Sequence, residues 1–161
     1  MGIRTMALLI ARVVTAAWVG AAVLFVITSV REVSHPEIDT ATRNLLPGIR
    51  FPAYYATGII LMGAGLLSAS LAAGHPQLSR WRRRTTVALL SLAFVCMCVD
   101  YVWIYSPLLA VLSAESMVKP SEFVGYHRAS EMINGFELVL VLVAAGLLSL
   151  APERPVPSPE S

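Results

Sequence analysis

The sequence predicts an all-α protein, a four-helix transmembrane bundle, because the chain is strongly apolar and contains four long stretches with few charges. Hydrophobic residues make up 57% of the 161 residues and charged residues only 14%, whereas soluble domains are nearer half apolar and a quarter charged. A helix needs about 20 mostly apolar residues to cross the hydrocarbon core of a bilayer. The predicted spans are residues 6–30, 51–73, 85–112 and 123–151.

Each predicted span has its own boundary signals. The first span carries no charged residue from Val13 to Val30. The second follows Pro47 and Gly48, which we expect to end a short helix that Asp39 caps in the preceding loop. The third follows the arginines at 80–84, and the fourth consists almost entirely of Leu, Val and Ala from 138 to 150. Residues 1–151 therefore form one membrane domain, and we expect the proline-containing tail, 152–161, to be disordered.

The charge distribution predicts how the bundle is oriented in the membrane. Arg80, Arg82, Arg83 and Arg84 fall within five residues between the second and third spans. Basic loops favour the cytoplasmic side, so we expect the Arg80–Arg84 loop and both termini to face the cytoplasm of a bacterial inner membrane. A net charge of +2 is too small by itself to indicate nucleic acid as a partner. The expected partners are the lipid bilayer, a small ligand and further copies of the chain.

A polar stripe in the fourth span is the most informative feature of the sequence. His127, Ser130, Glu131, Asn134 and Glu137 follow one another at steps of three and four, which places them within an arc of about 120° on a helix. An ionised side chain near the bilayer centre costs at least about 2.5 kcal/mol. We therefore expect this stripe to face the bundle interior or a wet cavity.

The rise of 1.5 Å per residue predicts which groups of other spans lie beside the stripe. Asp100 is about 24 Å along the helix from Arg84, and Asn134 is about 25 Å from Ala151, so the two side chains should lie at the same height. The other polar groups expected near this level are Tyr54, Tyr55, Thr28 and Ser29. The candidate binding site is therefore Asp100, His127, Ser130, Glu131, Asn134, Tyr54 and Tyr55.

Several chemistries remain open for such a site. His127 is the candidate ligand or proton carrier, with Glu131 beside it as the second ligand of a metal ion. The alternatives are a path for protons or ions, and a structural network that only fixes the packing of the helices. The sequence contains no phosphate-binding glycine loop, no zinc-protease motif and no nucleophile elbow, so a binding protein is favoured over an enzyme.

The chain also resembles a known group of membrane proteins, the four-helix family that includes transmembrane protein 205 and bacterial relatives. The pattern Phe123, His127, Ser130 and Asn134 in the fourth span carries most of this resemblance. The other matching residues are Trp18, Gly20, Phe51, Pro52, Tyr54, Tyr55, Asp100 and Pro107.

This resemblance implies a four-helix bundle but no particular activity. The chain is also distantly similar to copper-resistance D-type membrane proteins and to a haem-binding protoporphyrinogen oxidase, so copper and haem are the cofactors to test. The leading hypothesis is an inner-membrane protein whose outward-facing polar site binds a metal ion, haem or a small polar ligand. The alternative is a non-enzymatic scaffold or assembly partner.

Overall fold

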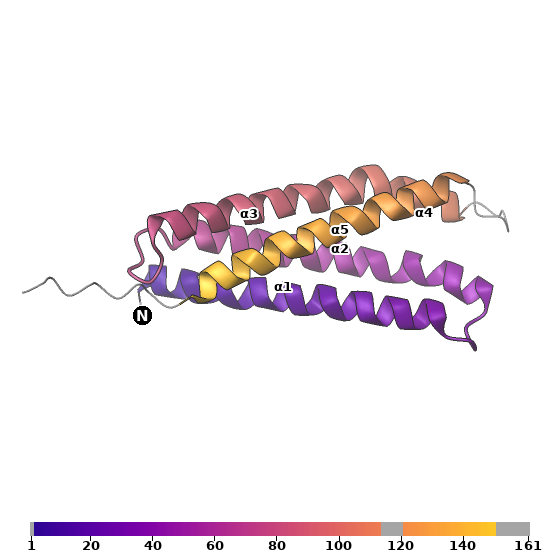
Figure 1. The fold of residues 1–161 in the computed structure, drawn as a ribbon, viewed down its shortest axis with the longest axis horizontal. Helices are drawn as coiled ribbons and strands as arrows, with labels where there is room; N and C mark the ends of the chain where they lie inside the picture. Colours follow the sequence, from indigo (N-terminus) through magenta and orange to yellow (C-terminus); the bar gives the residue numbers. More distant parts are fainter. Residues whose placement is uncertain (1, 114–120, 151–161) are drawn as a thin grey trace, which may run out of the picture.

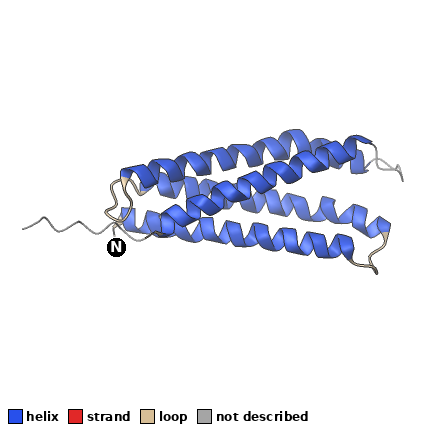
Figure 2. Ribbon diagram, viewed as in Figure 1, coloured by secondary structure: helices blue, strands red, loops and turns tan. Residues whose placement is uncertain are grey.

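The computed structural model of the chain describes residues 2–113 and 121–150, without the side chains at 44, 110–113 and 121–123. The described part consists of helices and their connections, with no strand (Figures 1 and 2). The tail at 152–161, predicted to be disordered, lies outside the described residues. The elements are α1 (Ile3–Ser34), α2 (Thr40–Leu71), α3 (Arg80–Val99), the π-helix η1 (Asp100–Tyr105), α4 (Ser106–Ser113) and α5 (Ser121–Ser149).

The helices form four rods that lie side by side, because α3, η1 and α4 continue one another (Figure 1). Helix α2 packs between α1 and α3, and α5 closes the bundle by packing against α3 and α1. Four helical stretches are long and apolar enough to cross a membrane: Ile3–Ser34, Thr40–Leu71, Arg80–Leu109 and Val124–Ser149. The predicted all-α architecture with four candidate spans is therefore confirmed.

Helix α2 begins much earlier than the predicted second span, and the expectation that Pro47 and Gly48 end a separate short helix is wrong. The helix runs unbroken from Thr40 through Pro47 and Pro52. A proline inside a helix removes one backbone hydrogen bond and crowds the preceding turn. Contacts with α1 compensate for this cost, because the Arg50 side chain between the two prolines is bonded to α1. The Phe51 ring also packs on α1.

The predicted cap at the start of this helix is confirmed. Asp39 has an extended backbone, and its Oδ1 accepts a hydrogen bond of 2.7 Å from the Thr42 backbone N–H. Such a side chain satisfies one of the amides that a helix N-terminus leaves free. The same hydrogen bond lowers the pKa of the Asp39 carboxyl group below its ordinary value. The cap therefore weakens when acidification protonates Asp39.

Two arginines close the opposite end of the bundle, where the α2–α3 loop lies. Arg82 is 4% exposed, and its guanidinium donates hydrogen bonds to the carbonyl oxygens of Leu147 and Leu150. Arg12 donates from Nε to the Leu148 carbonyl oxygen over 2.7 Å. The last carbonyls of a helix have no partner within the helix, so α1 and α3 supply the donors that end α5.

Gly58 marks a close approach between helices. A Cβ atom added to Gly58 would lie 2.4 Å from Met97 Cε and 2.7 Å from Trp18 Cη2. Met97 is fully buried and Trp18 is 1% exposed, so neither side chain has free space into which to move. The absence of a side chain at 58 thus allows α2 to pack against α1 and α3.

Gly58→Ala should therefore lower the free energy of unfolding by about 1–3 kcal/mol, the usual cost of overpacking a core. Gly20→Ala is the matched control, because a Cβ at Gly20 meets nothing within 4 Å and alanine is the better helix former. Thermal unfolding of both variants in mild detergent measures the difference. Equal melting temperatures for the two variants would contradict this account of the packing.

Candidate functional site

Asp100 is the centre of a polar cluster that joins three rods of the bundle. The residue begins η1 and is fully buried. Its Oδ2 accepts hydrogen bonds from Tyr55 Oη at 2.6 Å, Ser130 Oγ at 3.0 Å and Asn134 Nδ2 at 2.6 Å. The donors come from α2 and α5, so a single oxygen atom connects α2, η1 and α5.

Tyr54 completes this arrangement by fixing the orientation of the Asn134 amide. The Tyr54 hydroxyl donates to Asn134 Oδ1 over 3.0 Å, while Asn134 Nδ2 donates to Asp100 and to the Ser130 carbonyl oxygen. A flipped amide would lose these bonds, so the network determines which end of the amide faces Asp100. We call Asp100, Tyr54, Tyr55, Ser130 and Asn134 the Asp100 cluster.

The structure thus brings together five of the seven residues predicted for the site. The height of Asp100 relative to Asn134, estimated from helical rise alone, is confirmed by their direct hydrogen bond. The predicted proximity of Tyr54 and Tyr55 to this level is confirmed by their own bonds to Asn134 and Asp100.

Glu137 lies one turn beyond Asn134 on α5 and was not among the predicted site residues, although it belongs to the polar stripe. Its side chain is 1% exposed, and its Oε1 accepts a hydrogen bond of 3.0 Å from Trp18 Nε1. The signal in the sequence was the step of three from Asn134, together with a tryptophan deep inside the first span.

Each of these two buried acids keeps one oxygen without a hydrogen-bond partner in the described part of the chain. These atoms are Asp100 Oδ1 and Glu137 Oε2. The ion pairs found among the described residues are Arg50–Glu32 and His127–Glu131, and neither involves a buried acid. Buried polar atoms without a partner are rare and frequently indicate a water or an ion. The arrangement is therefore suited to holding a proton or a small cation.

The widened helix η1 positions Asp100 within the third rod. The Ser106 backbone N–H bonds to the Tyr101 carbonyl five residues earlier, and Ser106 Oγ donates to the same oxygen over 2.8 Å. Pro107 follows, and a proline has no N–H to give to the preceding turn, against which its ring also clashes. A π-turn before the proline accommodates this disruption, and such turns are frequent at functional sites.

Aromatic rings cover the Asp100 cluster on the side away from the α2–α3 loop. The Tyr55 and Tyr105 ring centroids are 5.0 Å apart, and Phe51 packs on Tyr105 at 5.4 Å. Phe25 of α1 lies against Tyr54 at 4.4 Å. These rings separate the cluster from the polar groups farther along α1 and α2.

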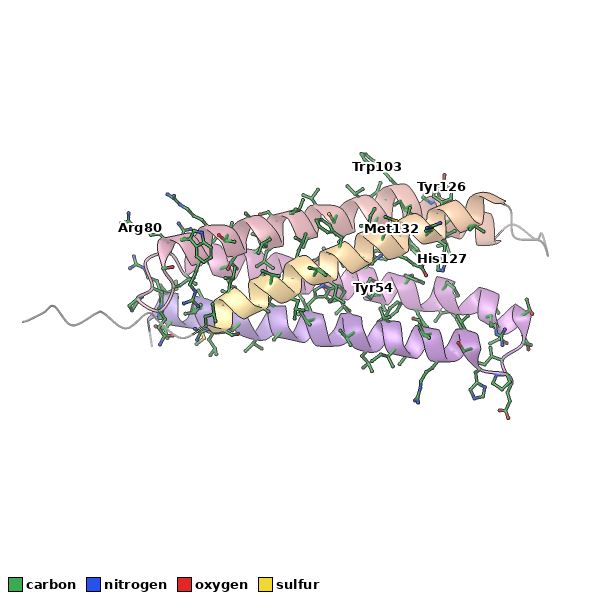
Figure 3. The ribbon with its side chains drawn as sticks, viewed as in Figure 1. Tyr54, Arg80, Trp103, Tyr126, His127 and Met132 are labelled. Atoms are coloured by element: carbon green, nitrogen blue, oxygen red, sulfur yellow. The ribbon has the colours of Figure 1, made fainter. Side chains whose placement is uncertain are left out.

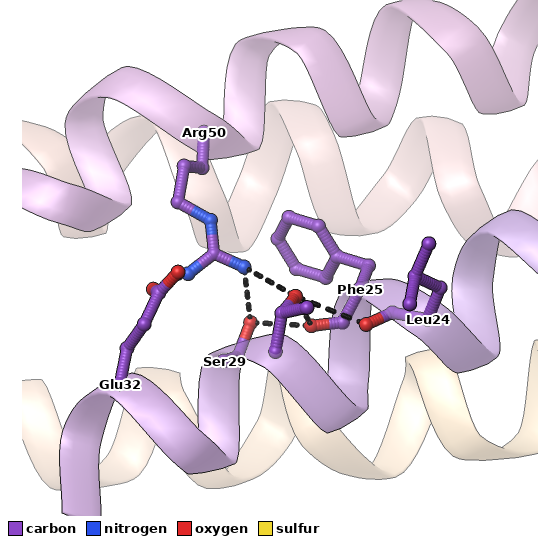
Figure 4. A network of polar contacts seen from close by, with 6 residues as sticks. Leu24, Phe25, Ser29, Glu32 and Arg50 are labelled. Atoms are coloured by element: carbon purple, nitrogen blue, oxygen red, sulfur yellow. Dashed lines mark hydrogen bonds and ion pairs between the residues drawn. The ribbon is translucent and has the colours of Figure 1, made fainter. Parts of the chain in front are cut away.

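Those outer polar groups form a separate network around Arg50 (Figure 4). Arg50 forms an ion pair with Glu32, and its Nη2 donates to Thr28 Oγ1 at 3.1 Å and to Ser29 Oγ at 2.9 Å. The guanidinium also lies 4.8 Å from the centroid of the Phe25 ring. Thr28 and Ser29 therefore accept hydrogen bonds from Arg50. They do not join the Asp100 cluster, although their predicted height suggested that they would lie near it.

His127 and Glu131 do not join the Asp100 cluster. They form a pair with Nε2 and Oε1 3.2 Å apart, and their side chains are 52% and 65% exposed. Figure 1 shows α5 crossing the bundle obliquely, with its first turns near α4. In Figure 3, His127 lies farther from the middle of the bundle than Tyr54. The polar stripe follows one face of α5. Because α5 crosses the bundle obliquely, this face is buried at Glu137 and exposed at His127.

The structure does not support the predicted metal or haem site. Within the described ranges, no group of three or more His, Cys, Asp or Glu side chains is placed to hold a metal ion. His127 and Glu131 supply only two ligands, on the outside of the bundle, whereas zinc sites in proteins usually supply at least three.

Comparisons with known proteins leave the family open. No family model, curated protein or solved structure matches the chain significantly. The resemblance to the family of transmembrane protein 205 therefore stays a prediction.

The hydroxyl groups of Tyr55 and Tyr105 offer a direct test of the cluster. Tyr55→Phe removes a donor to Asp100 and should lower the free energy of unfolding by about 1.5–3 kcal/mol, the range for bonds to charged groups. Tyr105→Phe is the control, because its buried hydroxyl has no hydrogen-bond partner in the described residues. Thermal unfolding in detergent should show a clear loss for Tyr55→Phe only, and equal losses would contradict this view of the site.

Proposed function

We propose that this chain is a membrane-embedded binding protein that holds a small cation, a proton or an alkali ion, at Asp100. The observation that carries the proposal is the asymmetry of this fully buried carboxyl group. Three neutral donors bond to Oδ2, while Oδ1 has no partner in the described part of the chain. The saturated oxygen anchors the group, and the free oxygen is available to the ligand.

An uncompensated charge inside an apolar bundle is unfavourable. A carboxylate near the bilayer centre is expensive, and neutral hydrogen bonds to one oxygen recover only part of the lost hydration. A bound proton or cation at Oδ1 would remove the remaining cost. The hydroxyl oxygens of Tyr55 and Ser130 lie beside the carboxyl group, and oxygen ligands suit hard cations.

The proposed cation site at Asp100 replaces the predicted metal or haem site at His127. A metal or haem ligand at His127 and Glu131 would stand on the exposed outside of α5, away from the buried acids. The cation version instead uses residues that the helices enclose. It involves no catalysed reaction, which agrees with the absence of familiar catalytic motifs from the sequence.

The setting that we propose is a bacterial inner membrane, with the Arg80–Arg84 loop and both termini in the cytoplasm according to the positive-inside rule. Asp100 then lies about 24 Å from the cytoplasmic edge, in the outer half of the membrane. The ligand would enter from the outer side. Membership of the transmembrane protein 205 family and self-association of the bundle are compatible with this setting.

A structural scaffold is the second candidate function. The hydrogen bonds to Asp100 Oδ2 support it. Because that atom accepts bonds from both α2 and α5, the cluster can fix the register of three rods without binding anything. Polar residues within membranes often have this function.

The two candidates predict different effects of Asp100→Asn on how the stability of the protein depends on ligand concentration. A cation held only by the folded protein raises stability by mass action, by about 2.7 kcal/mol at 100 times the Kd. For a proton, stability therefore falls as pH rises, because the folded state binds more protons than the unfolded state. Melting temperatures of the wild type and of Asp100→Asn should be measured across pH and across Na⁺ and K⁺ concentrations.

We expect Asp100→Asn to lose the dependence on Na⁺ and K⁺ and to change the dependence on pH, while Glu131→Gln, which alters an exposed carboxyl group on α5, keeps both. A uniform drop in melting temperature with unchanged pH and cation dependence would favour the scaffold and reject the proposed function.

A further inference from the structure

Glu137 is a second buried acid close to the proposed cation site. It is 1% exposed and has Trp18 Nε1 on one oxygen, while Oε2 has no partner in the described residues. No basic residue of the described part forms an ion pair with it. A protonated Oε2 would leave the acceptor bond of Oε1 intact and would remove the cost of an isolated charge.

A continuous set of contacts connects Glu137 with Asp100. The Trp18 ring, which bonds Glu137, packs on the Tyr54 ring with 5.1 Å between centroids. Tyr54 donates to Asn134, and Asn134 donates to Asp100. Glu137 is also only three residues from Asn134 on α5, one helical turn from the residue that donates to Asp100.

In the part of the chain that the structure describes, few other titratable groups act on this pair. The groups that interact with Glu137 or Asp100 from the packed elements are Tyr54 and Tyr55 of α2 and Cys96 of α3, and α1 contributes the indole N–H of Trp18. These groups are neutral in their ordinary protonation states near pH 7. The charge of the pair therefore depends chiefly on how many protons the two acids hold.

We propose that Asp100 and Glu137 form a two-carboxyl proton relay in the interior of the bundle. One proton moves between Asp100 Oδ1 and Glu137 Oε2: an O–H bond breaks on one acid as another forms on the other, and the charge of the pair stays at −1. This inference rests on the proposed function and extends it, because it assigns the proton as the cation and adds a second residue that carries it.

The hydrogen bonds determine where the proton rests. Three donors stabilise a negative charge on Asp100, whereas one donor stabilises it on Glu137. Hydrogen bonds to the charged form favour that form. When the pair holds a single proton, that proton therefore rests on Glu137, and a second proton that binds at Asp100 allows Glu137 to release its own.

Infrared difference spectroscopy of the full chain in lipid, titrated with acid and base, tests the relay. The stretching band of a protonated carboxyl group is sensitive to hydrogen bonding, so Trp18→Phe should shift the band that Glu137→Gln abolishes. In Asp100→Asn the negative neighbour is gone, and the Glu137 band should disappear at a pH lower by about one unit or more than in the wild type. Glu131→Gln is the control and should leave this band unchanged.

The relay is overturned if Glu137→Gln leaves the carboxyl bands unchanged, or if Glu137 titrates at the same pH in the wild type and in Asp100→Asn. If Glu137→Gln does not yield folded protein, the comparison of Trp18→Phe with the wild type decides whether the band belongs to Glu137. The proposed function fails on a different result, unchanged cation dependence of stability in Asp100→Asn, so the two failures can be told apart.

Discussion

The bundle depends on satisfying one buried carboxyl group, Asp100, inside an apolar structure. Basic side chains do not pair with it in the described part of the chain, so neutral donors must come from neighbouring helices. Tyr55 of α2 and Ser130 and Asn134 of α5 supply them. Because all three donors meet at one oxygen, a shift of either helix by one residue would break the cluster. The same requirement thus sets both the packing and the site.

The basic groups that stabilise the bundle lie toward its two ends, and the two buried acids lie between them. Arg82 ends α5 through backbone carbonyls at the end that holds the α2–α3 loop. Arg50 joins α2 to α1 toward the other end, where it contacts Glu32 and the hydroxyls of α1. Between them, only neutral donors of the described residues bond to Asp100 and Glu137. This separation of charge is the basis of the proposed cation site.

Much of the site could be predicted from the sequence because helical rise is nearly constant. The constant rise predicts that Asp100 and Asn134 lie at one height, and the two side chains are hydrogen-bonded. The exposure of His127 could not be predicted, since it depends on the oblique path of α5 across the bundle. The role of Arg50 cannot be predicted from the sequence, because Pro47 and Gly48 suggest a loop before the second span, whereas tertiary contacts keep α2 helical.

A high-resolution experimental structure of the wild-type chain in lipid tests the central claim most directly. The account predicts density for a water molecule or a cation within hydrogen-bonding distance of Asp100 Oδ1, with Oδ2 still bonded by Tyr55, Ser130 and Asn134. Protein donors on both oxygens of Asp100, with no density beside the carboxyl group, would contradict the account and leave the cluster as a purely structural link between helices.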